Sequence, residues 1–74
     1  MTNELDATGL KCPLPVLRAK KRLKDVDAGA SMRVLATDPD AVADFEAFCA
    51  ETGHAFVGWT KDGDILTITI RKSG

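Results

Sequence analysis

The sequence has no long apolar run: no segment approaches the roughly 20 consecutive apolar residues that cross a bilayer. Its first residues, Met1 to Asp6, are polar and acidic, unlike the positively charged start of a secretion signal. We therefore expect no membrane association and a cytoplasmic location. What remains is a chain of 74 residues, 45% hydrophobic and 28% charged. This predicts a single domain over residues 1–74, with a thin core and no large internal pocket.

Cysteine and histidine are scarce, because Cys12, Cys49 and His54 are the only residues of these two types. Two cysteines cannot build the disulfide framework of a small secreted domain. The three residues also lack the spacing of zinc ligands. We expect two free thiols, no metal and no cofactor.

Aromatic residues make up only 5% of the chain, and none lies among the basic residues. Proteins that bind single-stranded nucleic acid combine a basic groove with aromatic stacking platforms. The net charge is −1, whereas nucleic-acid-binding domains are commonly basic. A nucleic-acid-binding module therefore stays as an alternative only, and we expect no direct nucleic-acid partner.

The charges are separated along the chain. Residues 7–24 contain no acidic residue and carry a charge of +6, whereas residues 25–74 carry −5. Such a basic segment can steer an acidic partner protein by long-range attraction, although a solvated helix face would look the same. The basic residues are Lys11, Arg18, Lys20, Lys21, Arg22 and Lys24.

Six segments have the periodicity of regular structure, in the order strand, helix, strand, helix, strand, strand. The second helix is expected to have Asp38 as its N-cap, Pro39 at its first position and Gly53 as its C-cap. Right-handed crossovers then give a βαβαββ two-layer α/β (α+β) sandwich, with two helices on one face of a four-stranded mixed sheet. The segments are residues 3–8, 13–26, 31–37, 39–52, 55–60 and 65–71.

The dipeptide Asp62-Gly63 predicts a hairpin turn between the last two strands. A two-residue loop at this point pairs Trp59 with Leu66 and places Trp59 in the core. In the same register Ala55, Val57, Ile68 and Ile70 face the core. The open face of the sheet is expected to carry Leu35, Phe56 and Ile65 among threonines, with Gly58 as a possible bulge.

This topology places the start of both helices at one end of the sheet. Cys12 lies at that end, and His54 lies about 17–20 Å away at the other end, one strand length. His54 is therefore interpreted as a surface or capping residue rather than a base for Cys12. Cys49 belongs to the apolar stripe of the second helix and is predicted to lie in the core, out of disulfide reach of Cys12.

The unusual local sequence is Gly9-Leu10-Lys11-Cys12-Pro13-Leu14-Pro15. Cys12 is expected to be the N-cap of the first helix, with Pro13 at the first helical position. The helix dipole, the adjacent Lys11 and the free N–H groups of Leu14 and Val16 would then lower the pKa of the thiol and make it a nucleophile. Without a second thiol in reach, Cys12 suits group transfer between proteins rather than dithiol redox chemistry. The alternative is a small residue that merely precedes a helix.

The residues Leu5-Asp6, Gly9-Leu10 and Cys12-Pro13-Leu14-Pro15 resemble the signature of the TusA/SirA family of small bacterial sulfur carriers. A second block, Ala36-Thr37-Asp38-Pro39 followed by Phe45, Cys49 and Gly53-His54, also resembles that family. The resemblance covers essentially the whole chain. Only Leu14, where other members often have Glu, stands out, and it can bear on the choice of partner.

The resemblance implies a fold similar to the C-terminal domain of translation initiation factor three. It implies that Cys12 carries sulfane sulfur as a persulfide in a sulfurtransferase-type relay, supported by the motif residues Asp6, Gly9, Lys11, Pro13, Leu14 and Pro15. The implied donor is a cysteine desulfurase or a rhodanese-like protein. Acceptor proteins with acidic docking surfaces would serve tRNA thiolation, molybdenum-cofactor synthesis or sulfur oxidation. We expect a monomer that docks these partners through Arg18, Lys20, Lys21, Arg22 and Lys24; a regulatory interaction domain without sulfur transfer is the alternative.

Overall fold

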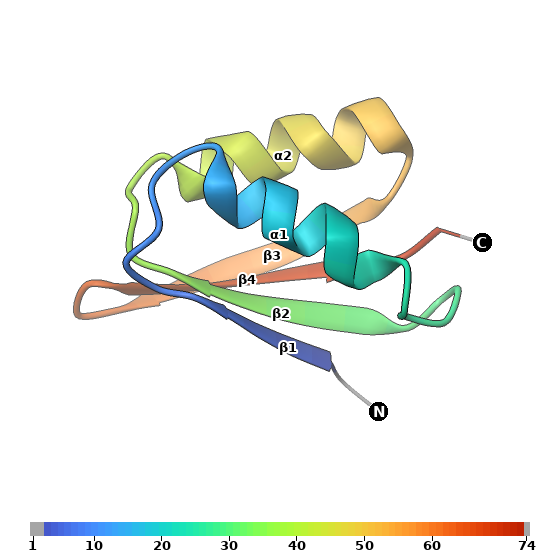
Figure 1. Ribbon diagram of the computed structural model, residues 1–74, viewed down its shortest axis with the longest axis horizontal. Coiled ribbons are helices and arrows are strands. Elements are labelled where there is room, and N and C mark those ends of the chain that lie inside the picture. Colours follow the sequence, from blue (N-terminus) through green and yellow to red (C-terminus); the bar gives the residue numbers. More distant parts are fainter. Residues whose placement is uncertain (1–2, 74) are drawn as a thin grey trace.

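A computed structural model describes residues 3–73 and contains the six elements in the predicted order. Two helices lie side by side on one face of a four-stranded sheet, which leaves the other face open (Figure 1). The βαβαββ two-layer architecture is therefore confirmed. The elements are β1 (Asn3–Ala7), α1 (Leu14–Leu23), β2 (Ser31–Ala36), α2 (Ala41–Thr52), β3 (Ala55–Asp62) and β4 (Ile65–Arg71).

The sheet has the strand order β1-β2-β4-β3. β1 pairs parallel to β2, and β4 runs antiparallel between β2 and β3. The parallel pair needs a crossover that passes over one face, and α1 provides it. As a result, the β1–α1 loop, the β2–α2 turn and the β3–β4 turn all lie at one end of the sheet, on the left in Figure 1.

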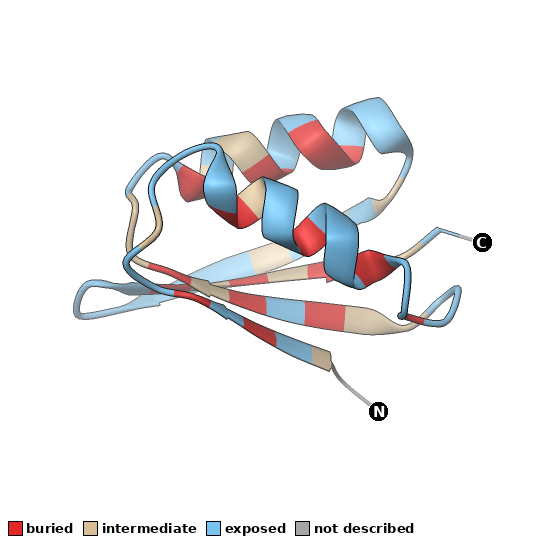
Figure 2. Ribbon diagram, in the orientation of Figure 1, coloured by how far each residue is buried: buried red, intermediate tan, exposed pale blue. Residues whose placement is uncertain are grey.

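The core lies between the sheet and the two helices, where the buried residues of every element face inward (Figure 2). Phe45 of α2 and Ile68 of the central strand β4 are completely buried. Cys49 is also buried, as predicted from its place in the apolar stripe of α2. Neither helix among residues 3–73 has the length and apolar character needed to cross a membrane.

α1 is shorter than the predicted helix over residues 13–26. It begins at Leu14, with Pro13 rather than Cys12 as the N-cap. Beyond Leu23 the chain forms turns with hydrogen bonds three residues apart. The N–H of Asp25 donates to the carbonyl of Arg22, and the N–H of Val26 donates to the carbonyl of Leu23. Such three-residue turns commonly end a helix, and here they still bring Val26 into the core.

α2 begins two residues after the predicted start at Pro39, and Asp40 rather than Asp38 is its N-cap. The carboxylate of Asp38 accepts a hydrogen bond from the N–H of Asp40 at 3.0 Å, which forms a turn before the helix. The predicted C-cap is confirmed, since Gly53 ends the helix with φ of +82°. Glycine adopts this left-handed conformation without steric cost.

The hairpin register differs from the prediction. Gly63 and Asp64 form the loop, so that Asp62 pairs with Ile65 and Trp59 pairs with Ile68 instead of Leu66. Trp59 therefore lies on the same face as the buried β4 residues, but on the edge strand β3 49% of its surface stays exposed. The prediction of a core tryptophan is wrong for this reason.

A β-bulge between Phe56 and Gly58 corrects a second prediction. Val57 has no partner on β4 there, and past the bulge Phe56 pairs with Ile70. Phe56 therefore packs against the core, whereas Val57 is 52% exposed. The predicted assignment of Phe56 to the open face is wrong, because a bulge inserts one residue and reverses the alternation beyond it.

We expect Ile68→Val to lower the free energy of unfolding by about 1 kcal/mol, because it removes one methylene from a fully packed site. Ile65→Val on the same strand is the matched control, since Ile65 is 43% exposed. Urea denaturation measures both values. An equal loss in the two variants would contradict the placement of the core.

Candidate functional site

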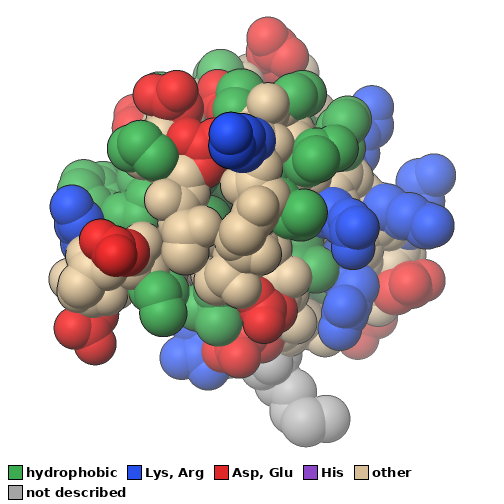
Figure 3. Space-filling view, turned by 60° about the vertical axis from the view of Figure 1, so that its left-hand side comes forward, with side chains coloured by type: hydrophobic (Ala, Val, Ile, Leu, Met, Phe, Trp, Pro, Cys, Tyr) green, Lys and Arg blue, Asp and Glu red, His purple; other side chains and the backbone are tan. Residues whose placement is uncertain are grey.

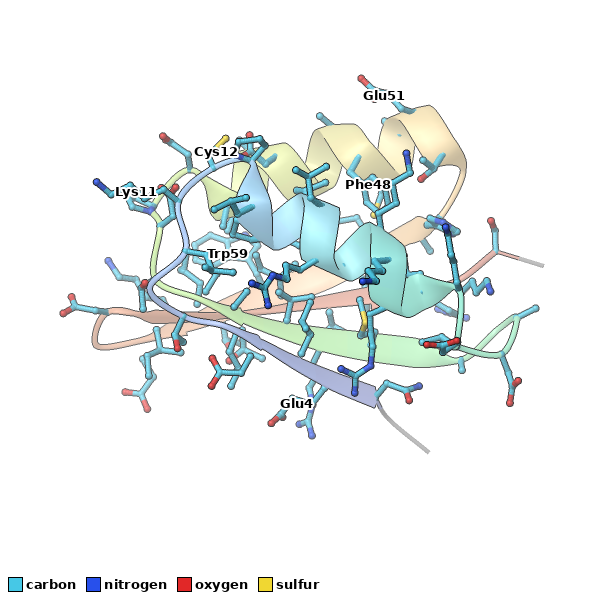
Figure 4. The ribbon with its side chains drawn as sticks, viewed as in Figure 1. Glu4, Lys11, Cys12, Phe48, Glu51 and Trp59 are labelled. Carbon is cyan, nitrogen blue, oxygen red and sulfur yellow. The ribbon has the colours of Figure 1, made fainter. Side chains whose placement is uncertain are left out.

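Cys12 lies at the end of the sheet where the β1–α1 loop meets the β2–α2 turn. Its side chain and that of Lys11 sit at this end, away from Phe48 and Glu51 toward the other end of α2 (Figure 4). The thiol is free and the residue is exposed. His54 directly follows α2 at the opposite end, as predicted, where its Nδ1 accepts a hydrogen bond from the N–H of Ser73 at 3.1 Å.

Two hydrogen bonds fix the Cys12 loop to the β2–α2 turn. The N–H of Gly9 donates to Oγ1 of Thr37 at 2.9 Å, and the N–H of Cys12 donates to Oδ2 of Asp38 at 2.6 Å. The other oxygen of Asp38 accepts a hydrogen bond from the N–H of Asp40. One carboxylate therefore links the β1–α1 loop to the β2–α2 turn. These hydrogen bonds, and the coulombic effect of Lys11, hold the pKa of Asp38 below its usual value.

Asp6 stabilises the beginning of the same loop through its side chain. Its carboxylate accepts hydrogen bonds from Oγ1 of Thr8 at 2.6 Å and from the N–H of Thr8 at 3.0 Å, and both lower the pKa of Asp6. This local turn ends β1. Gly9 then reverses the chain with φ of +79°, which a side chain would strain.

The helix start around Cys12 differs from the expected arrangement. Cys12 stands one residue before the N-cap, and the Cys12–Pro13 peptide bond is cis. Pro15 is buried in the first turn, whereas Leu14 is 46% exposed. The N–H of Leu14 donates to the carbonyl of Lys11 at 2.8 Å, so it is not free to face the sulfur as predicted.

The electrostatic environment of Cys12 is acidic rather than basic. A hydrogen bond with Asp44, some desolvation and the negative charges of Asp44, Asp38 and Asp40 raise the pKa of the Cys12 thiol to about 11. The expected lowering of this pKa is therefore wrong. Nothing in the sequence next to Cys12 indicates these carboxylates, because they belong to the start of α2; the run of aspartates after Thr37 was the available signal.

The sulfur faces an open hollow of about 460 Å³. Residues 9–12 of the first loop form one side of it, and residues 37–40 of the second turn form the other. Within residues 3–73, no three His, Cys, Asp or Glu side chains are grouped so that they could hold a metal ion.

Of the basic residues predicted for docking, Arg18, Lys20, Lys21 and Arg22 lie on α1, and Lys24 is the C-cap of that helix. The last turn of the helix carries Lys20, Lys21 and Arg22, and all of them are exposed. Arg18, Lys21 and Arg22 border a groove that the exposed side chains of Leu14 and Leu17 also line. Lys and Arg side chains gather on the right in Figure 3, whereas hydrophobic and acidic side chains are mixed on the left.

Comparison with known proteins gives a consistent result. Residues 3–72 match the family described as Sulfurtransferase TusA. A putative sulfur carrier protein of Neisseria meningitidis is 49% identical over 67 residues, which cover 90% of each chain. Sulfur carrier protein TusA of Allochromatium vinosum is 47% identical over 70 residues, covering 95% of this chain and 92% of that one. The crystal structure of a SirA-like protein from Desulfitobacterium hafniense superposes with a TM-score of 0.83 at 29% identity, covering 100% of both chains.

We expect Asp44→Asn to increase the rate at which iodoacetamide alkylates Cys12 at pH 8. Loss of the negative charge lowers the thiol pKa, and each unit of lowering gives about ten times more thiolate below that pKa. Asp25→Asn, which removes a carboxyl that does not act on Cys12, should leave the rate unchanged. A pH profile of the alkylation rate measures the pKa directly, and an unshifted profile in Asp44→Asn would contradict the assigned cause.

Proposed function

Because this chain belongs to the TusA family of sulfur carrier proteins, we propose that Cys12 accepts sulfane sulfur as a persulfide and passes it to an acceptor protein. The contrast between the two thiols supports this role. Cys12 is exposed beside an open hollow, while Cys49 is buried in the core. A carrier needs one sulfur that two partners can reach in turn, and only Cys12 meets that need.

The transfer is balanced without an external oxidant. The sulfur of Cys12 attacks the terminal sulfur of a donor persulfide, and a new S–S bond forms on Cys12 as the donor S–S bond breaks. The electron pair of the broken bond stays on the donor sulfur, which leaves as a thiolate and takes up the proton that Cys12 gives up. The acceptor then repeats the attack on the Cys12 persulfide.

The acidic surroundings of Cys12 favour its protonated form before a donor arrives. The thiolate is the nucleophile in sulfur exchange, so the proton must leave as the donor persulfide approaches. A partner that brings a positive charge next to Asp38, Asp40 and Asp44 would offset the effect that raises the pKa of Cys12. Docking of such a partner would therefore make Cys12 more reactive than it is in the free carrier.

The donor in this proposal is a cysteine desulfurase or a rhodanese-like protein. The basic face of α1 offers the docking surface for an acidic acceptor, because complementary charge steers the encounter. Leu14 and Leu17 add apolar area within the same groove. The acceptor serves one of three routes: tRNA thiolation, molybdenum-cofactor synthesis or sulfur oxidation.

We expect Cys12→Ser to abolish sulfur loading when the reduced protein is incubated with a cysteine desulfurase and cysteine. Cys49→Ala should load like the unsubstituted protein; alanine is chosen because a serine hydroxyl would be buried without a partner. Intact mass and peptide mapping measure the gain of one sulfur atom, which a thiol reductant should reverse. Equal loading of Cys12→Ser would contradict the proposal.

A further inference from the structure

β1 is an outer strand of the sheet, and one of its edges is free. The strand order β1-β2-β4-β3 gives β1 a partner on one side only within the described residues 3–73. In Figure 1 it is the lowest strand, with α1 above it. The unpaired N–H and C=O groups of such an edge can bind an extended segment of another protein as an additional strand.

A groove of about 560 Å³ lies between this strand and α1. Leu5 of β1 lines it, and the other lining residues recur every three to four positions from Leu14 to Asp25. Residues at this spacing share one face of a helix, so they form a stripe along α1 and the turn after it. The stripe is about 16 Å long at 1.5 Å per residue. This matches the length of β1, which has five residues at about 3.3 Å each.

The end of the groove nearest the sulfur is apolar. Leu14 and Leu17 line this end and are half-exposed, although the opposite side of the helix is buried in the core. Leu14 follows Cys12 by two residues, so their Cα atoms are at most about 7 Å apart. A segment that lies in the groove therefore has one end close to the thiol.

The middle of the groove is basic. Arg18, Lys21 and Arg22 line it, and none of them forms an ion pair in the described part of the chain. Asp25 is the one acidic residue of the lining, and it stands at the far end from Leu14. Three positive charges therefore face one negative charge, and the middle of the groove lacks an acidic partner.

We propose that an extended segment of the acceptor protein occupies this groove and adds to the free edge of β1 as a further strand. The side chains of such a strand point alternately to the two faces of the sheet. Those on the α1 side are apolar beside the two leucines and acidic beside the three basic residues. Those on the open face are neutral and polar, because Glu4 and Asp6 are exposed there. This inference rests on the proposed function, since it states how the acceptor is recognised.

Other occupants fit the groove less well. Two copies of this chain paired through their β1 edges would bring the basic stripes of two α1 helices together, and like charges that face each other are destabilising. A nucleic acid would satisfy the positive charges but would leave the strand edge and the leucines unused. The groove also has no aromatic side chain on which a base could stack. An acidic segment with alternating apolar side chains uses every part of the surface.

The first test uses the blocked peptide Thr-Leu-Thr-Glu-Thr-Leu-Thr, which has the proposed alternation and the same order of side chains in both directions. Its control, Thr-Thr-Leu-Glu-Leu-Thr-Thr, has the same composition and charge but places both leucines on the open face. The first peptide should bind about tenfold more tightly, the effect of burying one further leucine side chain. Titration of the isotope-labelled protein, followed by its amide chemical shifts in NMR spectra, measures both affinities.

Amide hydrogen exchange in the same samples separates strand addition from contact with α1 alone. Exchange in β1 should slow when the first peptide binds, because the outward N–H groups of β1 become hydrogen-bonded. Exchange in β3, at the other edge of the sheet, should stay the same. Unchanged exchange in β1, or equal affinities of the two peptides, would overturn the inference.

The second test compares Lys21→Glu with Lys20→Glu, because both lysines are exposed on α1 but only Lys21 lines the groove. Lys21→Glu should weaken binding of the first peptide about tenfold, because repulsion replaces attraction to the peptide's glutamate. Lys20→Glu should weaken it less than about twofold. Equal losses would reflect the overall charge of the helix and would contradict the groove. Binding of an oligouridylate in place of the peptide would also contradict it.

Loading of Cys12 from inorganic polysulfide tests the carrier proposal without the groove, because polysulfide has no side chains to dock. Normal loading together with equal affinities of the two peptides would overturn strand addition alone. If Cys12 takes up no sulfur, the carrier proposal fails instead. The peptide titration still decides on the groove in that case, since it does not require sulfur on Cys12.

Discussion

The carboxylate of Asp38 is the group on which the arrangement of the site depends. One of its oxygens accepts the N–H of Asp40 and orders the turn before α2, while the other accepts the N–H of Cys12. Without this bridge, the hydrogen bond from Gly9 to Thr37 would be the one left between the β1–α1 loop and the β2–α2 turn within residues 3–73. The bond to Cys12 is made to its backbone, so the loop is fixed while the thiol stays exposed.

The same bridge brings negative charge to the sulfur. Fixing Cys12 against the start of α2 places it near Asp40 and Asp44, and these raise the thiol pKa although the sequence neighbours of Cys12 are basic or apolar. Cys12 also stands one residue before the N-cap of α1, outside the first turn in which the effect of the helix dipole is concentrated. The local sequence therefore predicted the wrong direction for the shift of the Cys12 pKa. The charges that raise this pKa are distant from Cys12 along the chain but close to it in space.

Local sequence patterns predicted the architecture, but they did not predict the exact helix starts or the bulge in β3. Element order, the two helices on one face and the buried Cys49 depend on periodicity and crossover handedness, both of which the sequence displays. The helices begin one and two residues later than predicted. Pro13 is the N-cap of α1, and Asp38 forms a turn before α2 through its side chain. The burial of Phe56 and the exposure of Val57 reflect a bulge, and only the presence of Gly58 suggested one.

Placing the sulfur between two chemically different surfaces resolves a difficulty that any small carrier has. The loaded and unloaded forms must meet different proteins at the same atom, and a domain of this size has no room for an enclosed pocket that could select between them. On this chain Cys12 has the basic residues of α1 on one side and the carboxylates of Asp38, Asp40 and Asp44 on the other. In the proposed role, a partner would be selected by the flank that its charge matches, because like charges brought together cost several kcal/mol whereas matched charges speed the encounter. One end of a small sheet can provide both surfaces. The β1–α1 connection leads into the basic helix, the β2–α2 connection carries the aspartates, and Cys12 lies where the two connections meet.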